Sequence, residues 1–424
     1  MGHTNQPHTA KFLTAVLLLC SLLFMALSCY REAPLETAPQ EEATKPAEQE
    51  PVSEQVPEVE KTPAEESGVT EEPEPLVHSI TIIVNQQGGR VDWGKNNLIA
   101  HSRFGQDGYY DLWVMDSDGS SAKCLTCDNP RIPQLHNGQP AWHPSGRYIV
   151  FQSQDPSLPH TRQEDNRQTQ PGFGKHNNLW VTDPEGKNFY QLTSIKQNGA
   201  ILHAHSSHDG LKLTWAEKIG IGASDWAIMI ADFVEIPQPH LENITPYQPL
   251  GNVWYETHDF SPDDSRVLFT AGTGATSWSG FDIWDMEIAT QKLNRLTSDP
   301  EIWDEHAHYS PDGEKIVWAS SREYPYDPST FDKAVATLKL DYWIMDADGL
   351  NKQRLTYFNE PRHEHYMGYT SIVADCSWSP DGRKIVASVL CGQGRASTRI
   401  VVIELNDIAL ESAFPQTSKQ NARI

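Results

Sequence analysis

The sequence predicts an all-β fold, a six-bladed β-propeller of four-stranded blades that is closed by an N-terminal strand pairing with the last blade. Two repeated phrases and one spare strand lead to this prediction. The first phrase is usually an aromatic residue, then a four-residue turn and a short apolar strand. The second is a strand, an Asp/Gly turn and a strand that ends in Leu-Thr.

The first phrase begins each repeat unit with a hairpin. It is found at Trp142 (WHPSGRYIVFQS), Ser206 (SSHDGLKLTWAE), Phe260 (FSPDDSRVLFTA), Tyr309 (YSPDGEKIVWAS) and Trp378 (WSPDGRKIVASV), with a degenerate copy at Trp93 (WGKNNLIAHS). In the turn, Pro sets the first central φ, Asp suits the second position and Gly accepts the left-handed conformation that follows. Strand residues on both sides of such a turn form a hairpin.

The second phrase adds two more strands to each unit. It appears as DLWVMDSDGSSAKCLT, NLWVTDPEGKNFYQLT, DIWDMEIATQKLNRLT and YWIMDADGLNKQRLT, and in a looser form as WAIMIADFVE. The units recur at intervals of about 50 to 70 residues, and four strands at such a period are typical of a propeller blade. Six copies of the first phrase therefore predict six blades.

The last unit has no closing Leu-Thr strand. Its strands lie at CSWSP, KIVASVL and TRIVVIEL, and a ring that stopped there would leave an exposed edge, which promotes aggregation. The segment HSITIIVN, residues 78–85, precedes the first unit. We expect it to pair with RIVVIEL and to close a propeller that spans residues 78–410.

Residues 1–28 predict an export signal of the lipoprotein type. Lys11 precedes the apolar run FLTAVLLLCSLLFMAL, which has the length of a signal h-region and is short for a spanning helix. The run ends in ALSC, and cleavage before Cys29 would leave that cysteine free for lipidation. Ala26 stands where such signals usually carry Leu. The alternatives are a plain secretory signal and an uncleaved anchor. We expect an exported protein, in the periplasm or at the cell surface, anchored to a membrane by lipid on Cys29.

Residues 29–77 are predicted to be a disordered Pro- and Glu-rich tether, and residues 411–424 a flexible tail. Between Arg31 and Leu76 there are 14 Glu against three basic residues, which gives this segment a charge of -11 out of the chain's -24. The segment has few apolar side chains to bury. Because their burial cannot offset the entropy lost on ordering, we expect the segment to stay solvated. An acidic chain without a basic cluster also argues against nucleic acid as a partner.

Four cysteines lie in the predicted propeller, at Cys124, Cys127, Cys376 and Cys391. The CLTC motif alone is a weak indication of metal or redox chemistry, because the second pair is not another CxxC. In an oxidising compartment, one or two disulfides are expected. Buried free thiols are the alternative.

Polar side chains precede the turns of the first phrase. Residues two and four before the turn share one face of the first strand, which is the strand nearest to the channel. These pairs are Gln139/Ala141, His203/His205, Thr257/Asp259, His306/His308 and Asp375/Ser377. His258 faces the other way in a regular strand, and a bulge would re-aim it. Converging imidazoles and carboxylates suit a divalent ion, and a polar channel that binds only water is the alternative.

The phrases SPDGEKIVWASS and YWIMDADGLNKQRLT resemble the WD40-like (PD40) repeats of TolB-type six-bladed propellers, and this resemblance extends from His78 to about Leu410. It implies a propeller fold and a binding function. Together with the predicted lipid anchor, we expect a monomeric propeller lipoprotein that binds a protein or glycan of the cell envelope. TolB carries an α/β domain before its propeller. Here the predicted tether occupies that place, so a role in the Tol system is not carried over.

The motifs ETHDF and HAHYSPDG resemble those of oligogalacturonate lyases, propellers with seven blades that hold Mn²⁺ through three His and one Gln. The resemblance implies His258, His306 and His308 as metal ligands. Trp303 stands at the position of the Gln, so Glu256, Asp304 or Glu305 would complete the ligand set. A lyase removes a proton beside a uronate carboxylate, which the metal acidifies.

Two further roles follow from the lyase resemblance. His203 or His205 would act as the catalytic base. The side chains available to pair with the substrate carboxylate are Arg103, Arg322 and Arg362.

The sequence therefore leaves two function hypotheses. The first, which the TolB-type repeats favour, is a binding scaffold without chemistry. The second is an enzyme with a divalent metal, Mn or Zn, that acts as a polysaccharide lyase or hydrolase.

Overall fold

The structure of the protein is a computed structural model that describes residues 75–165, 168–273, 280–392 and 398–410. The predicted signal, the predicted lipidation site Cys29, almost all of the predicted tether and the predicted tail lie outside these residues. None of the helices in the described ranges is long and apolar enough to cross a membrane.

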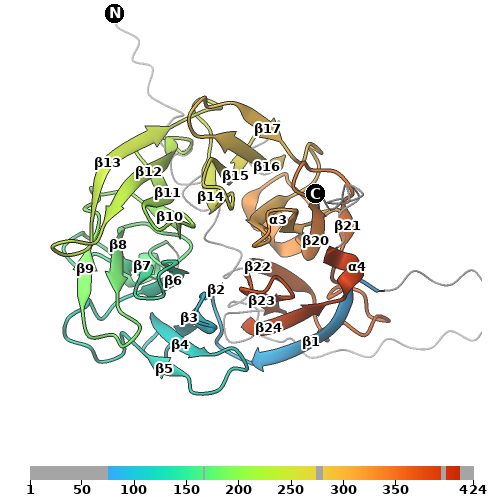
Figure 1. The fold of residues 1–424 in the computed structure, drawn as a ribbon, viewed down its shortest axis with the longest axis horizontal. Helices are drawn as coiled ribbons and strands as arrows, with labels where there is room; N and C mark the ends of the chain where they lie inside the picture. Colours follow the sequence, from blue (N-terminus) through green and yellow to red (C-terminus); the bar gives the residue numbers. More distant parts are fainter. Residues whose placement is uncertain (1–74, 166–167, 274–279, 393–397, 411–424) are drawn as a thin grey trace, which may run out of the picture. The chain divides into compact units, whose positions relative to one another are not determined.

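Six four-stranded antiparallel sheets form a ring (Figure 1), which confirms the six-bladed fold. The first three blades consist of β2 (Val91–Trp93), β3 (Leu98–Phe104), β4 (Tyr110–Asp116) and β5 (Lys123–Cys124); β6 (Asn137–Trp142), β7 (Ile149–Gln154), β8 (Asn177–Thr182) and β9 (Phe189–Gln191); and β10 (Ile201–Ser206), β11 (Lys212–Lys218), β12 (Trp226–Val234) and β13 (His240–Tyr247). The fourth and fifth consist of β14 (Tyr255–Phe260), β15 (Arg266–Gly272), β16 (Phe281–Glu287) and β17 (Leu293–Arg295); and β18 (Asp304–Tyr309), β19 (Lys315–Ser320), β20 (Asp341–Asp346) and β21 (Gln353–Arg354).

The sixth blade contains strands from both ends of the described chain. It consists of β22 (Ser371–Trp378), β23 (Lys384–Cys391), β24 (Thr398–Leu405) and β1 (Val77–Val84). Strand β1 pairs antiparallel with β24, with Ile80 opposite Ile403. The predicted closure is therefore confirmed, and β1 gives β24 the neighbour that the last repeat unit lacks.

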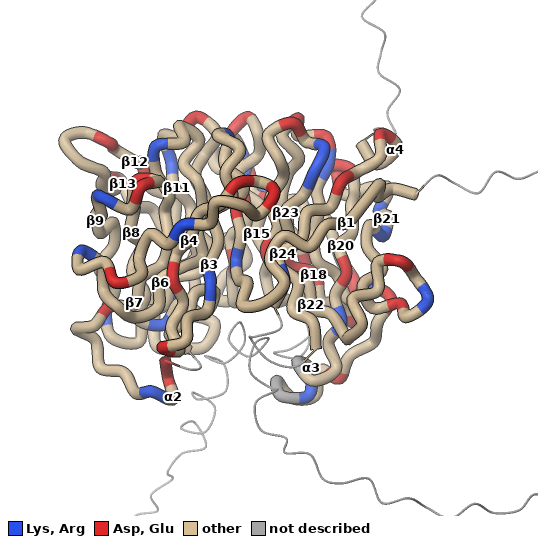
Figure 2. Tube along the Cα trace, turned by 90° about the horizontal axis from the view of Figure 1, so that it is seen from below, with Lys and Arg blue, Asp and Glu red and all other residues tan. Residues whose placement is uncertain are grey.

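Three short helices lie outside the sheets: α2 (Arg162–Asp165), α3 (Phe331–Thr337) and α4 (Asp407–Leu410). In the side view of Figure 2, α2 and α3 lie at one edge of the ring and α4 at the opposite edge. Lys384, the first residue after the last turn, pairs with Glu404 close to α4. The turns after the first strands therefore lie on the α4 side.

The turn of the first phrase is held by its own side chains. In the fifth blade, the Ser310 hydroxyl donates to Asp312 Oδ1 (2.6 Å) and accepts from the Lys315 backbone N–H (2.9 Å). Gly313 has φ +76°, in the left-handed region that glycine enters without a steric penalty. These bonds explain why the phrase needs Ser, Asp and Gly at these spacings.

The Leu-Thr ending of the second phrase also has a structural role. In the fifth blade, the Thr356 hydroxyl accepts from the Tyr342 N–H (3.0 Å) and donates to Asp341 Oδ1 (2.9 Å). In the first blade, Thr126 likewise donates to Asp111 Oδ1 (2.7 Å). An Asp at the start of the third strand and a Thr at the end of the fourth strand thus join the two outer strands of a blade.

The cysteines of the propeller divide into two kinds. Cys124 and Cys127 form a disulfide. Cys376 and Cys391 are free and buried. The structure thus contains one of the expected disulfides together with two buried thiols.

His101 on β3 makes stability depend on pH. The side chain is buried, and burial lowers its pKa from 6.5 to about 4, so it is neutral in the folded chain. On acidification the unfolded chain binds this proton first, so stability is lost as the pH falls from about 6.5 to 4, by roughly 3 kcal/mol. Denaturant unfolding between pH 7 and 4 should show the loss, and His101→Gln should make the dependence shallower. An equal slope in both proteins would contradict this assignment.

Candidate metal centre in the central channel

The first strands of five blades are bulged a few residues before their turns. The register with the second strand shifts at Gly138/Ala141, Leu202/His205, Thr257/Asp259, Glu305/His308 and Val373/Cys376. Within these bulges Gln139, His203 and His306 have φ of +50°, +45° and +55°. Left-handed backbone costs a non-glycine residue roughly 1–2 kcal/mol and is concentrated at functional sites. The strain thus falls on polar residues of the channel.

The bulges bring four side chains together, which we call the channel cluster: His203, Glu256, His258 and His306. One ligand atom from each lies within 4.8 Å of the others, and all four residues are buried. His258 belongs to the cluster because the bulge in β14 re-aims it, as the sequence suggested. The cluster draws on the third, fourth and fifth blades.

Contacts inside the cluster centre on one carboxylate oxygen. Glu256 Oε1 forms an ion pair with His203 Nε2 and lies 3.7 Å from His306 Nδ1. The His258 and His306 Nδ1 atoms are buried and make no hydrogen bond. Because buried polar atoms are normally bonded, these two nitrogens are positioned to bind a ligand.

The other nitrogen of each imidazole contacts a group outside the cluster. These groups are Asp375 Oδ1, 3.2 Å from His203 Nδ1; Thr270 Oγ1, 2.6 Å from His258 Nε2; and Glu305 Oε1, 3.5 Å from His306 Nε2. Metal-binding histidines usually have one ring nitrogen held in this way, which fixes the tautomer and the ring orientation. The four residues could therefore hold a metal ion, with each imidazole contacted from outside the cluster.

Arg90 joins the cluster to the sixth blade. Its guanidinium forms a buried ion pair with Asp375 and lies 3.4 Å from His306 Nε2. Burial raises the pKa of Asp375, but Arg90, His306 and His203 outweigh it and hold that pKa well below its usual range. Asp375 is therefore ionised and can orient His203.

The protonation states in the cluster differ strongly between neighbours. Burial lowers the pKa of His203, but Glu256 and Asp375 outweigh it and raise it to about 9. Burial lowers the pKa of His306 to about 3. Burial and the Glu256 charge raise the pKa of Glu305 to about 8. A cation in the site would replace the proton of His203.

A pocket of about 430 Å³ opens beside the cluster on the turn side of the ring, and we call it the mouth pocket. Its lining includes the residues two before each turn: Asp92, Ala141, His205, Asp259, His308 and Ser377. Aromatic side chains of the repeat, Trp93, Trp142, Tyr309 and Trp378, complete the walls. The rings of His205 and His308 are 5.1 Å apart, and the His308 ring is 6.5 Å from that of His258. His205 and His308 therefore lie between the pocket and the cluster.

The structure separates the histidines that the sequence grouped. Glu256, His258 and His306 lie together as expected for ligands, and His203, expected as a base, lies among them. His308, expected as a ligand, lines the mouth pocket beside Asp259, with His308 Nδ1 3.7 Å from Asp259 Oδ2. His205, the other expected base, also lines that pocket.

The three arginines expected to bind substrate lie elsewhere. Arg103 stacks on the Trp113 ring at 5.0 Å and Arg322 on the Trp343 ring at 5.6 Å. Arg362 is exposed on the segment between β21 and β22. None of them lines the mouth pocket, whose lining has Lys95 as its only Lys or Arg.

Two site residues were missed from the sequence, Arg90 and Asp92. They stand four and two residues before the turn of the degenerate copy at Trp93. The same spacing that marked the other five pairs would have found them. Trp303, at the position of the lyase Gln, packs in the core with its ring 4.4 Å from that of Phe281.

No protein-family model and no curated protein matches the chain by sequence. Among solved structures, TolB from Acinetobacter baumannii has 18% identity and a TM-score of 0.46 over 75% of this chain and 67% of that chain. A putative TolB from Agrobacterium tumefaciens has 16% identity and a TM-score of 0.46 over 77% and 96%. An oligogalacturonate lyase in complex with manganese has 12% identity and a TM-score of 0.43 over 80% and 98%. Similarity of this size assigns no activity, and the sheet topology of the chain itself establishes the six-bladed propeller.

Proposed function

We propose that this protein holds a divalent transition-metal ion in its central channel and acts with it on a glycan segment in the mouth pocket. The observation that carries the proposal is the convergence of three imidazoles and one carboxylate, with each imidazole supported from outside. This donor set suits Zn or Mn. A bound ion supplies Lewis-acid chemistry, which lowers the pKa of a bound water or of a proton beside a carbonyl group.

The chain's own residues would position the ligand. Burial lowers the pKa of His205 to about 3, so the ring is neutral and presents an acceptor nitrogen at the pocket floor. The Asp92 carboxylate accepts from Ser377 Oγ (2.7 Å), which fixes it on the pocket wall. Aromatic walls and fixed carboxylates are suited to sugar rings and their hydroxyl groups.

The pocket favours a neutral sugar over a uronate. Beyond the proposed ion, a uronate carboxylate would need further fixed cations such as Arg to offset the wall carboxylates, and the lining provides Asp92 and Asp259 against Lys95. We therefore favour hydrolysis of a neutral sugar over the lyase reaction. An assay of oligogalacturonate for unsaturated products separates the two reactions.

Metal content tests the proposal directly. The purified full chain should contain about one equivalent of Zn, Mn, Fe or Ni by elemental analysis. Loss of an outer partner typically weakens metal binding 10–100-fold, so His258→Ala should weaken it by about 100-fold or more. His308→Ala is the matched control, because His308 lies outside the cluster, and it should keep the metal. A metal-free chain whose stability is unchanged by His258→Ala and His306→Ala would refute the metal centre.

A binding scaffold is the second candidate function. The aromatic lining of the mouth pocket supports it, because such pockets serve recognition without chemistry as well. In this case the partner is an envelope protein or glycan, and the propeller is monomeric. The ion, or the proton that His203 carries in its place, then only shapes the channel floor.

We further propose that the protein is exported and anchored by lipid on Cys29. The Cys124–Cys127 disulfide supports export, because such bonds persist in oxidising compartments. Lipidation of Cys29 remains a prediction from the sequence.

A further inference from the structure

The first blade departs from the repeat at the position of an ion pair. In the fourth and fifth blades, the aspartate that begins the third strand pairs with an arginine opposite a tryptophan. These pairs are Asp282–Arg295 (2.6 Å), with Arg295 opposite Trp284, and Asp341–Arg354 (3.0 Å), with Arg354 opposite Trp343. In the first blade the aspartate is Asp111, and the residue opposite Trp113 is Cys124. In the first blade, Cys124 thus stands where the fourth and fifth blades carry the arginine that pairs with the aspartate.

The replacement places a carboxyl group against a disulfide. One carboxylate oxygen of Asp111 and the sulfur atoms of Cys124 and Cys127 lie within 4.8 Å of one another. Asp111 accepts from Thr126 Oγ1, and no Lys, Arg or His in the described ranges forms an ion pair with it. Burial raises its pKa, and the charges of Asp107 and Asp128 add to the effect. The Asp111 carboxyl is half-buried and lies beside both sulfur atoms, so it is placed to pass a proton from solvent to the sulfur that leaves.

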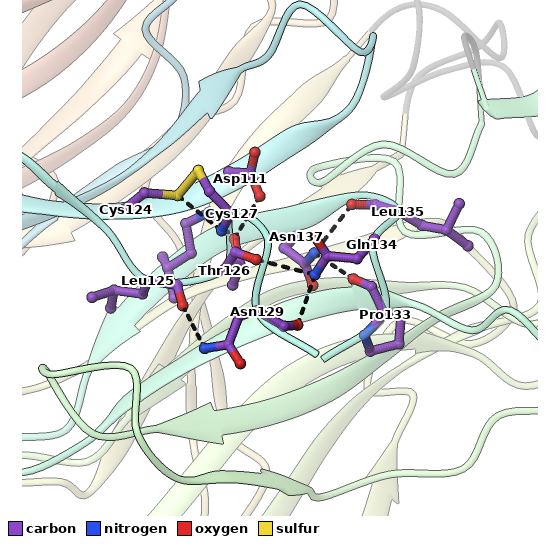
Figure 3. The surroundings of a disulfide bond; sticks show 11 residues. Asp111, Cys124, Leu125, Thr126, Cys127, Asn129, Pro133, Gln134, Leu135 and Asn137 are labelled. Carbon is purple, nitrogen blue, oxygen red and sulfur yellow. Dashed lines mark hydrogen bonds between the residues drawn. A yellow bond between two sulfur atoms is a disulfide. The ribbon is translucent and has the colours of Figure 1, made fainter. Parts of the chain in front are cut away.

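The loop around the disulfide is held by other bonds (Figure 3). Leu125 and Thr126, between the two cysteines, are buried. Asn129 Nδ2 donates to the Leu125 carbonyl (3.1 Å), and Gln134 Nε2 donates to the Thr126 carbonyl (3.1 Å). A disulfide stabilises least when it closes a short loop, and here it spans a sequence separation of 3. Its reduction should therefore leave the blade folded.

The disulfide is also accessible. Cys127 is exposed and lines a surface groove of about 380 Å³. Trp113 and Arg103, stacked at 5.0 Å, form part of the same groove beside Asp107. A second molecule can therefore reach Cys127 Sγ from solvent and rest on an aromatic surface while it reacts.

We propose that Cys124 and Cys127 form a redox-active pair that oxidises a dithiol bound in this groove, with Asp111 as its proton donor. A thiolate of the dithiol attacks Cys127 Sγ, the S–S bond breaks, and Cys124 Sγ leaves with the bonding electrons and takes a proton that Asp111 relays from water. The second thiolate of the dithiol then attacks the substrate sulfur of the mixed disulfide and releases Cys127, which takes a proton from water. Two electrons pass from the dithiol to the pair, and the dithiol becomes a disulfide. The two protons that the pair takes up balance the two that the dithiol released to solvent when it ionised. This activity is independent of the channel cluster.

Dithiothreitol serves as the probe dithiol. With the full chain at pH 7, alkylation and mass spectrometry should show reduction of the pair while the circular dichroism spectrum stays unchanged. Asp111→Asn should slow the reduction by about 100-fold, as expected for loss of a general acid. This variant should fold, because Asn178 already occupies the equivalent position in the second blade and accepts from Ile195 N and Thr193 Oγ1.

Asp107→Asn is the matched control, because it removes one negative charge from the same groove and should change the rate less than about twofold. Equal slowing by both variants would overturn the role of Asp111. Reduction only after unfolding would overturn the redox-active pair. If Asp111→Asn does not fold, the wild-type chain is equilibrated with reduced and oxidised glutathione. A structural disulfide stays oxidised in this buffer, whereas a redox-active pair exchanges with it.

Discussion

Deleting residues 78–85 is expected to destabilise the propeller by at least about 5 kcal/mol, because it removes the strand that completes the last blade. Strand β1 pairs with β24 along its length, and its residues Ile80, Ile83 and Val84 pack against the buried core. The deletion exposes β24 as an unpaired edge, which promotes association. Denaturant unfolding and size-exclusion chromatography measure the two effects.

Deletion of residues 63–70 is the matched control, since it removes the same length from the predicted tether. It should leave the unfolding midpoint unchanged. A synthetic peptide VHSITIIV, the sequence of β1, should restore part of the lost stability by adding the missing strand in trans. If the 78–85 deletion unfolds at the same denaturant concentration as the intact chain, β1 does not close the ring in solution.

Arg90→Met should destabilise the protein by about 3 kcal/mol, because it leaves the buried Asp375 carboxylate with His203 as its remaining charged partner. The side chains of Arg90 and Asp375 are only 8% and 9% exposed. The pair also joins the first blade to the sixth. Its loss therefore weakens the contact between these two neighbouring blades of the ring. Denaturant unfolding of the single variants and of Arg90→Met/Asp375→Leu gives a double-mutant cycle.

The double variant should recover much of the stability, since replacing both partners of a buried ion pair with apolar residues is often neutral. Lys384→Ala removes an exposed ion pair for comparison. The side chains of Lys384 and Glu404 are 39% and 40% exposed, so the loss of this pair should lower the free energy of unfolding by less than about 1 kcal/mol. Single variants at Arg90 and Asp375 that cost as little as Lys384→Ala would contradict this account.

The repeat made most of the fold predictable. The turn phrase specifies a hairpin through local features such as the hydrogen bonds of Ser310 and the left-handed backbone of Gly313. Each copy therefore forms the same structure wherever it occurs. Closure was predictable because a missing strand and a spare one stood at opposite ends. The degenerate copy at Trp93 carries less of this local information, and Arg90 and Asp92 were missed with it.

The site was predictable in outline and not in detail. Strand alternation places side chains two and four before the turn in the channel, and it gives His205 and His308 correctly as lining residues. It cannot locate a bulge, because a register shift depends on the pairing of two strands. The bulges decide that His258 and Glu256 join His203 and His306, and that His308 stands apart.

The closure of the ring also sets an order of events during folding. Ser79 and Glu404, which face each other across the closing pair, are 325 residues apart in sequence, and contacts of such separation form late. A chain made from its N-terminus carries β1 unpaired until β24 has emerged. Only a chain synthesised through Leu405 can seal the ring, so prematurely ended chains keep an open edge and are the ones most exposed to proteolysis.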